Sequence, residues 1–565
     1  MKILQLDVDN ITYEAIAPEA SIYEDIKEKK NSVDTALVLL ISVENGDTEE
    51  MAEKAMKDTD EFLKKLQRKK LVLYPYAHIS NNLAAPREAM HIINHMYKQK
   101  IPGVEVVKAP FGWTKKLSLN MKGHPLAEQS RSYGGSAEQR IYKKVKPVSV
   151  NTSIVRKSDI SGLPQEDHRT IGERLDLFSL QEVSPGMVYW HNNGVLIFNE
   201  LVYFIREKLK ENGYMEVVTP AIANLALWHV SGHIDHYRDN MFTFESTGEQ
   251  LGLKPMNCPS VMMIYKSRKW SYRELPVRLS DFDKLYRNEI SGALTGLFRV
   301  REMTQDDAHI FVTEAQLEDE IANLIRLVNE FYGRFGLSYK AMLSTMPDDH
   351  LGDEKLWEEA TQHLKNALKK NSVEYGIKEK DGAFYGPKID FQVKDSMGRE
   401  WQCATIQVDY QLPQRFGLSY VGEDGKEHMP IVVHRVIYGS LERFIAILIE
   451  HYKGKFPTWI APVQVAVVSI SEQQAGYAKE VYGRLKAHRI RAELDTSDKT
   501  LEYKIRDAKM HEIPYTIIIG RKEAEAKTVS VRNRNNVQKN AIKFQDFIDS
   551  INNEITNREG ELSIG

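Results

Sequence analysis

Residues 285–301 read LYRNEISGALTGLFRVR, and this stretch decides how the middle of the chain folds. Two short alternating segments flank a loop that contains Gly292 and Gly296, a pattern that predicts a β-hairpin-like arrangement. The arrangement would present Arg287, Arg299 and Glu289 on facing strands. A guanidinium group is planar and permanently charged, so it can bind phosphate in a bidentate manner. The stretch therefore predicts a phosphate site, although one such segment alone is more often a structural ion pair.

A second arginine lies in GSLERF at residues 439–444, directly before the apolar run IAILI at 445–449. Arg443 would thus sit in the first turns of an apolar helix. A charge buried there needs a partner, and a phosphate is a suitable one. The sequence contains neither a GxxxxGK[ST] loop nor GxGxxG after a strand, so a nucleotide would have to be bound in another way, for which these arginines are candidates.

Length and composition limit the class of protein. A chain of 565 residues predicts about three or four folded units. Hydrophobic residues make up 42% and charged residues 27%, as in soluble globular proteins. The longest apolar runs, 36–43 and 463–470, are far below the roughly 18 residues of a bilayer span, and no secretory signal is visible. With only Cys258 and Cys403, we expect no disulfide framework and a cytoplasmic protein without a membrane partner.

Changes in periodicity and in the positions of Pro, Gly and Ser along the chain predict four segments. Residues 1–146 alternate strand-like and helical runs, which favours an α/β domain. Residues 147–170 carry Pro, Gly and Ser without periodicity and are typical of a linker. Residues 171–455 mix helices and strands. The last segment, 456–565, opens at FPTWIAP and alternates strands and helices, which predicts a small parallel-sheet α/β domain.

The formal net charge of −3 conceals a strong pattern. Residues 1–61 hold 6 basic and 16 acidic side chains, whereas residues 62–146 hold 17 basic and 4 acidic ones. Such a contrast suggests a polyanionic partner near residues 62–146. A solvated lysine-rich surface is the alternative interpretation.

Taken together, the two arginine segments resemble the signature motifs of class II aminoacyl-tRNA synthetases, and their amino-acid sequence is most similar to that of the threonyl-tRNA synthetases. Further matching stretches lie in the same order between about residues 170 and 565. The resemblance implies a multidomain α+β and α/β protein with an antiparallel-sheet catalytic core. The stretches are GYMEVVTP (213–220) as motif one, YRNE (286–289) through Arg299 as motif two, residues 439–443 as motif three, and KPMNCP (254–259), FRVREMTQDDAHIF (298–311), FYGPKIDF (384–391), WQCAT (401–405) and FPTW (456–459).

The resemblance implies a role for individual residues of the catalytic core. Arg287 would bind the α-phosphate of ATP, Arg299 the β- and γ-phosphates, and Arg443 the γ-phosphate side. Positive charge placed where the departing pyrophosphate develops charge would make catalysis electrostatic and positional. The implied sets are Arg287, Arg443 and Lys388 for catalysis, Arg287, Glu289, Arg299, Gln402 and Arg443 for ATP with its Mg²⁺, and Met256, Gln305, Asp307, Tyr385 and Gln407 for the amino acid.

Metal ligands have several candidates in the sequence. Two groups have helical ligand spacing, residues 229–236 with three histidines and residues 91–95 with two, but neither has a nearby Cys or the Glu of HExxH. Spacing alone would not pair Cys258, His309 and His434. The resemblance implies that these three bind one Zn²⁺ per subunit, and three ligands leave a coordination position open.

An open zinc site explains amino-acid choice. Threonine can chelate the metal through its amino and hydroxyl groups, whereas valine lacks the hydroxyl and leaves polar groups unpaired. Serine lacks only a methyl group, which is worth about 1–3 kcal/mol and too little for accurate translation, so a correction step is expected.

Residues 1–146 are similar to the archaeal-type editing domain, which has the fold of D-aminoacyl-tRNA deacylases. The matching stretches are YPYAHIS (74–80), KAPFGWTK (108–115) and KGHPLAE (122–128). They imply that Lys115 lies near the scissile ester of seryl-tRNA(Thr), with His78 and Glu128 framing the pocket. Trp113 and Thr114 stand where aromatic residues are expected before the lysine. Three polar residues on loops remain the alternative.

The segment 456–565 is similar to the anticodon-binding domain of class IIa synthetases. Arg506, Glu523 and Arg532 align with anticodon-contacting positions, and Asp498 stands where asparagine is more usual. Residues 486–543 carry 14 basic and 8 acidic side chains, which suits contact with an RNA backbone.

The resemblance implies threonine, ATP and tRNA(Thr) as partners, and a homodimer built on motif one. Two alternatives stay open. Another class IIa enzyme, such as a prolyl- or seryl-tRNA synthetase, would have a different metal-ligand set. A catalytically silent, synthetase-like RNA-binding regulator would have no use for the three arginines.

Overall fold

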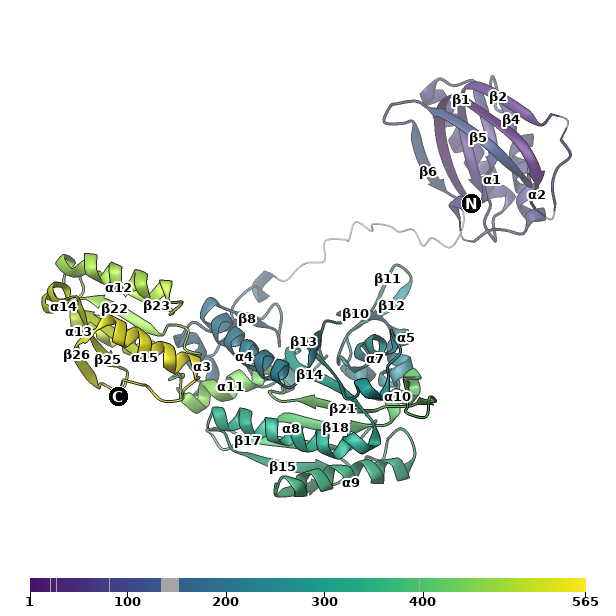
Figure 1. Cartoon of the computed structure of the whole chain (residues 1–565). Helices are drawn as coiled ribbons and strands as arrows, with labels where there is room; N and C mark the ends of the chain where they lie inside the picture. The colour runs from purple at the N-terminus through teal and green to yellow at the C-terminus, as the bar shows by residue number, and fades with distance from the viewer. Residues whose placement is uncertain (21, 27, 81, 134–151, 396, 565) are drawn as a thin grey trace. The chain divides into compact units, whose positions relative to one another are not determined.

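The computed structural model describes residues 1–20, 22–26, 28–80, 82–133, 152–395 and 397–564. The chain divides into two compact units, Met1–Val150 and Asn151–Gly565 (Figure 1). The end of the predicted first domain and the start of the predicted linker, residues 134–151, lie outside the described residues. From residue 152 the chain forms one 3₁₀ turn, Thr152–Ile154, and helix α3 (His168–Arg174) begins within the predicted linker range.

The first unit is a mixed sheet with two helices. Its strand order is β4-β3-β2-β1-β5, and β6 also pairs with β1. The parallel strands β2 and β3 end at the same edge, where a crevice forms naturally. The predicted alternation of strands and helices holds as far as β4, after which β5 and β6 follow with no helix between them. The elements are β1 (Lys2–Pro18), β2 (Lys30–Ser42), α1 (Glu49–Leu66), β3 (Lys70–Pro75), α2 (Pro86–Lys98), β4 (Glu105–Lys108), β5 (Trp113–Met121) and β6 (Glu128–Ser132).

Both helices of the first unit are amphipathic and pack on the same side of the sheet. Thr48 caps α1 by accepting a hydrogen bond from the backbone N–H of Met51, and Pro86 starts α2, where a missing N–H is tolerated. The buried sides of α1 and α2 share one hydrophobic cluster with residues of β2 and β3. This packing holds the carboxyl ends of β2 and β3 in place.

The second unit is built on an eight-stranded sheet with the order β16-β15-β17-β18-β21-β14-β13-β9. Its strands pair antiparallel except at the two edges, where β15 pairs with β16 and β13 with β9 in parallel. A hairpin is present as β13 and β14, whose register runs from Val277 opposite Phe311 to Tyr286 opposite Glu302. Arg287, Glu289 and Arg299 were predicted on its facing strands, but they lie in the segment that connects the two strands, because β13 ends at Tyr286 and β14 begins at Glu302. The strands are β9 (Met215–Val217), β13 (Val277–Tyr286), β14 (Glu302–Val312), β15 (Tyr339–Ser344), β16 (Tyr375–Lys378), β17 (Lys388–Lys394), β18 (Glu400–Asp409) and β21 (Ile431–Val436).

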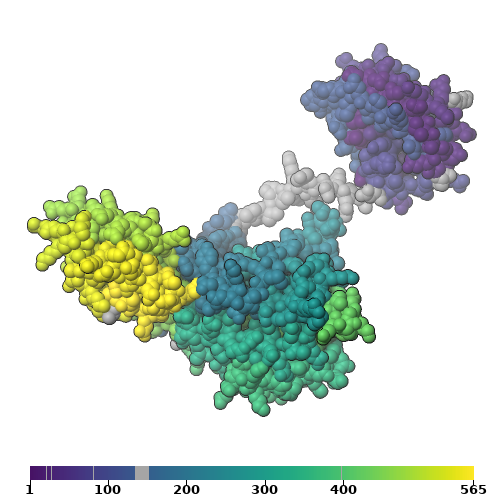
Figure 2. Space-filling view, viewed as in Figure 1, coloured from purple at the N-terminus to yellow at the C-terminus, as the bar shows by residue number. Residues whose placement is uncertain are grey.

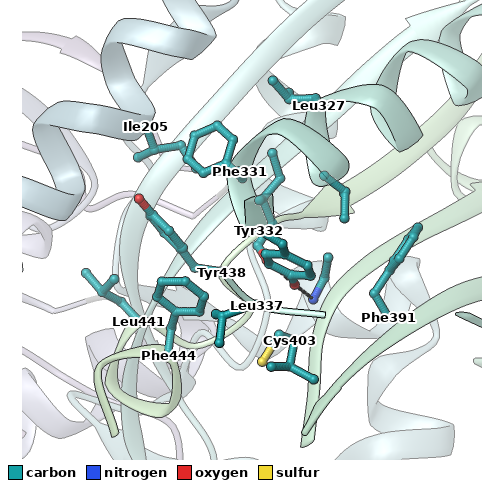
Figure 3. Packing of buried hydrophobic residues seen from close by; sticks show 14 of the residues in the cluster. Ile205, Leu327, Phe331, Tyr332, Leu337, Phe391, Cys403, Tyr438, Leu441 and Phe444 are labelled. Atoms are coloured by element: carbon teal, nitrogen blue, oxygen red, sulfur yellow. Dashed lines mark hydrogen bonds between the residues drawn. The ribbon is translucent and has the colours of Figure 1, made fainter. Parts of the chain in front are cut away.

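Four helices bury their apolar faces in one core with this sheet: α4 (Asn192–Glu211), α8 (Glu314–Arg334), α9 (Glu354–Lys370) and α11 (Leu441–Tyr452). Figure 1 shows α8 and α9 running side by side. In the core the Tyr332 hydroxyl donates to the Ile437 carbonyl at 2.9 Å and accepts from the Ala404 N–H at 2.8 Å. Figure 3 shows Tyr332 among Phe331, Leu337 and Phe444. Through Tyr332 the core thus holds the segment before α11, which contains Ile437, next to strand β18, which contains Ala404.

Smaller elements border the open side of the sheet. Helix α7 begins at Cys258, with Pro259 in its first turn. The remaining elements before residue 440 are β7 (Phe178–Leu180), β8 (Val188–Trp190), β10 (Ile222–Asn224), α5 (Leu225–Ser231), α6 (His233–Tyr237), β11 (Thr243–Ser246), β12 (Glu249–Leu253), α7 (Cys258–Lys266), α10 (Gln411–Phe416), β19 (Tyr420–Val421) and β20 (Glu427–His428).

The C-terminal domain has a five-stranded sheet in the order β23-β22-β24-β25-β26. The predicted strand and helix alternation is present, but the sheet is mixed, because β25 and β26 add in antiparallel fashion after the parallel strands β23, β22 and β24. Its elements are β22 (Val465–Ser469), α12 (Ala475–Ala487), β23 (Ala492–Asp495), α13 (Leu501–Met510), β24 (Tyr515–Ile519), α14 (Arg521–Ala526), β25 (Thr528–Asn533), β26 (Gln538–Lys543) and α15 (Phe544–Thr556).

The C-terminal domain contacts helix α4 of the same unit. Arg491 pairs with Glu200 at 2.5 Å, and Arg558 pairs with Glu207 at 2.6 Å. Figure 2 shows this contact between the yellow C-terminal residues and the blue residues around α4. None of the helices in the described ranges combines the length and apolarity that a bilayer crossing requires. The predicted fold class, an antiparallel-rich catalytic core between two α/β domains, is confirmed.

Candidate active site

A cavity of about 580 Å³ opens over β14, β18 and β21. The residues predicted for ATP, amino acid and metal come from six different stretches of the chain, yet all of them line this one cavity. They are Met256, Cys258, Arg287, Glu289, Arg299, Gln305, Asp307, His309, Tyr385, Lys388, Gln402, Gln407, His434 and Arg443.

Three buried side chains in the floor of the cavity form a group with metal-ligand chemistry. The ligand atoms of Cys258, His309 and His434 all lie within 4.8 Å of one another. His309 on β14 stands directly opposite His434 on β21 in the sheet register, and Cys258 comes from the start of α7. The three residues are 51 and 125 positions apart, so only the sheet register and α7 bring them together.

The hydrogen bonds of this group leave donor atoms free for a metal. Within the described part of the chain, neither ring nitrogen of His309 has a hydrogen-bond partner although the side chain is buried. His434 uses Nε2 to bind Asp409 Oδ2 at 2.8 Å, an arrangement in which a carboxylate orients a histidine toward a metal. Burial lowers the pKa of His309 and raises the pKa of the Cys258 thiol. The imidazole is therefore neutral, as a ligand must be.

A second buried group, Asp167, His168 and Glu450, satisfies the same distance criterion. Its atoms are already engaged, since Arg169 binds Asp167 at 2.8 Å and Arg399 binds Glu450 at 3.0 Å. The atoms of this second group are therefore already used in ion pairs, whereas among the described residues His309 in the first group keeps two unpartnered ring nitrogens that could bind a metal.

The histidines with helical spacing face separate partners. His233 is buried, and its two ring nitrogens face Ser231 Oγ at 2.8 Å and the Met256 sulfur at 3.2 Å. His236 binds the Asp349 carboxylate at 2.8 Å. The pair His91 and His95 contacts Glu49 on α1. In the described ranges none of them joins a group of three potential ligands.

Arginines line the other end of the cavity. Arg287 donates to the Pro255 carbonyl at 3.2 Å, and Arg443 donates to the Phe298 and Gln402 carbonyls at 2.9 and 2.7 Å. These partners are neutral, and among the described residues neither arginine has an ion-pair partner. Burial lowers the pKa of Arg443, so its cationic form gains from an anion in the cavity. Arg299 is paired with Glu289 at 2.9 Å.

Polar side chains between the two ends are held by the sheet. Asp307 accepts from the Asn257 amide at 3.3 Å, and burial raises its pKa. Gln407 donates to the Gly386 carbonyl at 2.9 Å, while Gln402 binds Asp390 at 2.6 Å. Lys388 also binds Asp390. These bonds aim the side chains at fixed points between the arginines and the Cys-His-His group.

The first unit has its own cavity of about 400 Å³ at the carboxyl ends of β2 and β3. Lys115 and His78 line it, together with Tyr74 and Trp113. The Lys115 ammonium donates to the Pro110 and Trp113 carbonyls at 3.0 and 2.9 Å and lies 5.1 Å from the Tyr74 ring centroid. Burial lowers the pKa of Lys115 to about 8.

Glu128, the third residue predicted for editing, starts β6 and stands opposite Leu6 in the register. It is exposed and does not belong to the residues that line this cavity.

The three residues predicted for anticodon contact lie on three elements. Arg506 is on α13, Glu523 on α14 and Arg532 on β25. Glu523 accepts from the Ser530 hydroxyl at 2.7 Å and from the Gly520 N–H at 3.0 Å. Its carboxylate therefore also secures the start of α14.

Several residues that line the cavity or support its lining were given no role from the sequence. Asp409 orients His434, and Trp401 stacks on Phe298 with centroids 4.2 Å apart. Buried Arg435 binds Asp306 at 3.1 Å, and burial raises the pKa of Asp306 to about 7. Trp401 and Asp306 lie within the matching stretches 401–405 and 298–311, and Arg435 is adjacent to His434, but neither signal says anything about contacts across strands.

Comparison with known proteins agrees with this geometry. Residues 242–452 match the family model for the tRNA synthetase class II core domain (G, H, P, S and T), residues 464–554 that for an anticodon binding domain, and residues 1–133 that for the Archaea-specific editing domain of threonyl-tRNA synthetase. An antiparallel sheet carrying an arginine-lined cavity, with this core match, defines a class II aminoacyl-tRNA synthetase.

The relatives narrow the class to one family. The chain is 48% identical over 419 residues to the threonine–tRNA ligase of Thermotoga petrophila and 48% over 432 residues to that of Clostridium tetani. These matches cover 73% and 75% of this chain, and the chain spans 66% of the length of each relative. A crystal structure titled as the RNA binding domain of threonyl-tRNA synthetase from Cryptosporidium parvum is matched over its full length and 71% of this chain, with 41% identity and a TM-score of 0.67. The chain belongs to the threonyl-tRNA synthetase family.

Proposed function

We propose that the protein is an ATP-dependent threonine–tRNA ligase. The observation that carries the proposal is the layout of the larger cavity, where two arginines with neutral partners share one space with the buried group of Cys258, His309 and His434. A triphosphate fits the cationic end, and a small amino acid fits the end with metal-ligand chemistry. The relatives named threonine–tRNA ligases support the same conclusion.

The arginines would act on the nucleotide. In the first step a carboxylate oxygen of threonine attacks the α-phosphorus of ATP. The new oxygen–phosphorus bond gives threonyl-adenylate, and the bond from the α-phosphorus to the bridging oxygen breaks, so that pyrophosphate leaves. Arg287 would contact the α-phosphate, Arg299 the β- and γ-phosphates, and Arg443 the γ-phosphate side, with Glu289 on the adenine side. Mg²⁺ would enter with ATP. Since no protein nucleophile is needed, the contribution of these residues is positioning and charge stabilisation.

Cys258, His309 and His434 would hold one Zn²⁺. The residues fit this ion, because a buried sulfur and unpartnered ring nitrogens converge within 4.8 Å and Asp409 orients one ligand. When bound, the ion acts as a Lewis acid that recognises an amino and a hydroxyl group together. Asp307 would receive the amino group of threonine, and Gln305, Tyr385 and Gln407 would limit the space for its side chain.

In the second step the 3′-terminal adenosine of tRNA(Thr) would attack the activated carbonyl and release AMP. The C-terminal domain would bind the anticodon loop, with Arg506, Glu523 and Arg532 as candidate contacts. Its 14 basic side chains against 8 acidic ones between residues 486 and 543 support contact with RNA phosphates.

The smaller cavity would hydrolyse seryl-tRNA(Thr). The Lys115 ammonium is held by two carbonyls in a cavity that aromatic and polar side chains line together. From there it would stabilise negative charge on an ester during hydrolysis. His78 lines the same cavity and would help to place water. Glu128 remains a proposed editing residue, although it does not line this cavity.

The second unit would form a homodimer through motif one. Strand β9 is an edge strand of the large sheet, and three apolar side chains near it are exposed: Val218 by 77%, Tyr203 by 60% and Met215 by 46%. An unpaired edge beside exposed apolar residues favours association with a second copy. Light scattering should give twice the chain mass of 64.9 kDa, and a mass of one chain would contradict the dimer.

Charging of tRNA tests the function itself. With ATP, Mg²⁺ and tRNA(Thr), we expect stable attachment of threonine to the tRNA and release of serine after its attachment. The scarcity of cysteine supports a cytoplasmic place for this reaction. A protein that binds tRNA(Thr) but attaches no amino acid would instead be a regulator.

A further inference from the structure

His168 is fully buried, at 1% exposure, outside the larger cavity and before the predicted catalytic motifs. Its Nδ1 lies 3.0 Å from Glu450 Oε1 in the last turns of α11. Its Nε2 accepts the backbone N–H of Leu297 at 3.1 Å. An Nε2 that accepts a hydrogen bond carries no proton, so the ring is the neutral Nδ1–H tautomer and donates to Glu450. One side chain thus joins α3, α11 and the segment between β13 and β14.

That segment, residues 290–300, is here called the nucleotide loop, because it carries Arg299. The loop is shaped around His168. Gly296 has φ +53°, and a Cβ on this residue would lie 2.2 Å from His168 Nε2. The Phe298 ring meets the His168 ring edge to face, with centroids 4.8 Å apart. The His168 ring therefore leaves no room for a side chain larger than that of glycine at residue 296.

The contacts of His168 lead directly to residues that line the cavity. The Phe298 carbonyl accepts from Arg443 Nε at 2.9 Å, and the Phe298 ring stacks on Trp401. Arg399 binds Glu450 at 3.0 Å and lies 4.8 Å from the Phe298 ring centroid. A shift of the loop away from His168 would therefore move both Arg299 and the acceptor that holds Arg443.

We propose that His168 is a positioning residue for ATP: it ties the nucleotide loop to α11, so that Phe298 and Arg299 meet the nucleotide in a fixed geometry. The inference rests on the proposed function. A metal at Asp167, His168 and Glu450 is not needed, because Arg169, Arg399 and the Leu297 N–H already engage the atoms that would bind it.

Two conservative variants separate the bonds of the ring. In His168→Asn the amide can still donate to Glu450 but cannot reach Leu297, whereas in His168→Gln the amide oxygen can still accept from Leu297. We expect His168→Asn to raise the KM for ATP in threonine-dependent pyrophosphate exchange by about tenfold, the equivalent of one hydrogen bond. The KM for threonine should stay within about twofold. His168→Gln should restore the KM for ATP to within about threefold of the wild type. His451→Gln, on α11 but away from the loop, is the matched control.

Direct titration of the full chain with ATP and Mg²⁺ gives a second readout that needs no catalysis. If the wild type binds ATP but shows no exchange, the proposed function fails, and the ATP dissociation constants of the variants still test His168. Equal effects of His168→Asn and His168→Gln, or a lower melting temperature with unchanged ATP affinity, would overturn the proposal. A second metal equivalent that disappears in His168→Asn would also overturn it.

A double-mutant cycle tests the pairing with Gly296. Gly296→Ala should weaken ATP binding by about tenfold in the wild type, because the new methyl group collides with the ring. In a His168→Ala background the collision with the ring is gone, while the contact with Arg169 Cδ at 3.0 Å and the positive φ of residue 296 remain. The same change should therefore cost clearly less than in the wild type. Full additivity of the two changes would contradict the proposed contact.

Discussion

The two cavities of this protein carry charge in different ways. The larger one is lined by four arginines and by buried Cys258, His309 and His434, whereas the smaller one contains a single half-buried lysine beside His78 and aromatic rings. A triphosphate and an amino acid need several fixed charges at once. Hydrolysis of an ester needs one positive charge near the carbonyl. In the proposed function, selection of the hydroxyl group and removal of serine would therefore be separate tasks, performed in separate units of the chain.

The largest expected effect breaks the larger cavity alone. Cys258→Ala should remove the proposed zinc and lower threonine-dependent pyrophosphate exchange by more than about a hundredfold. Mutation of a residue that only hydrogen-bonds to a metal ligand already lowers metal affinity or activity by about 10–100-fold. Hydrolysis of seryl-tRNA(Thr) should be unchanged. Elemental analysis and both rates measure this.

Cys403→Ala is the matched control, since Cys403 is also buried but does not belong to the Cys-His-His group. It should keep one zinc per chain. Undiminished zinc in Cys258→Ala would end the metal assignment.

The converse variant breaks the smaller cavity. Lys115→Ala should leave threonine charging intact and slow the hydrolysis of seryl-tRNA(Thr) by about a hundredfold, because a charge that faces the ester is lost. Lys115→Arg keeps the charge and should retain part of the rate. Unchanged serine clearance in Lys115→Ala would remove Lys115 from the mechanism.

A smaller loss of zinc affinity is expected when the residue that orients a proposed zinc ligand is changed. Asp409→Asn replaces the carboxylate that accepts from His434 and should weaken zinc binding by about 10–100-fold. Competition with a chelator measures this affinity. Asp349→Asn is the control, because Asp349 binds His236 away from the metal group. Equal zinc affinity in both variants would show that Asp409 does not orient a ligand.

The smallest effect is a pH dependence in the editing cavity. Burial lowers the pKa of Lys115 to about 8, so the ammonium is present below that pH and is lost as the pH rises through it. Enzymatic hydrolysis of seryl-tRNA(Thr), corrected for the uncatalysed reaction, should fall about tenfold between pH 7 and pH 9. Lys115→Arg should show no such fall. A rate that rises with pH would mean that the neutral amine acts.

The sequence predicted those parts of the fold that local patterns encode. The strand and helix alternation of both α/β domains and the hairpin around residues 285–301 follow from periodicity and turn residues. The direction of β25 and β26 did not, because a strand's sequence does not reveal which neighbour it pairs with. The pairing of β1 with β2, β5 and β6 did not follow from the sequence either, because it joins segments far apart in the chain.

The sites show the same limit. The family resemblance named Cys258, His309 and His434, whereas spacing alone would not have paired them. Asp409, Trp401 and His168 were missed because their roles depend on contacts across strands and loops far apart in the chain. A buried histidine shows its role only when the partners of both ring nitrogens are known.

The proposed function is tested most directly by pyrophosphate exchange measured with each of the twenty amino acids. We predict strong ATP–pyrophosphate exchange with threonine, weak exchange with serine and none above background with valine, because only the first two carry the hydroxyl group. Exchange that depends on proline, or on any amino acid without a hydroxyl group, would contradict the account, and so would the absence of threonine-dependent exchange in a zinc-loaded protein.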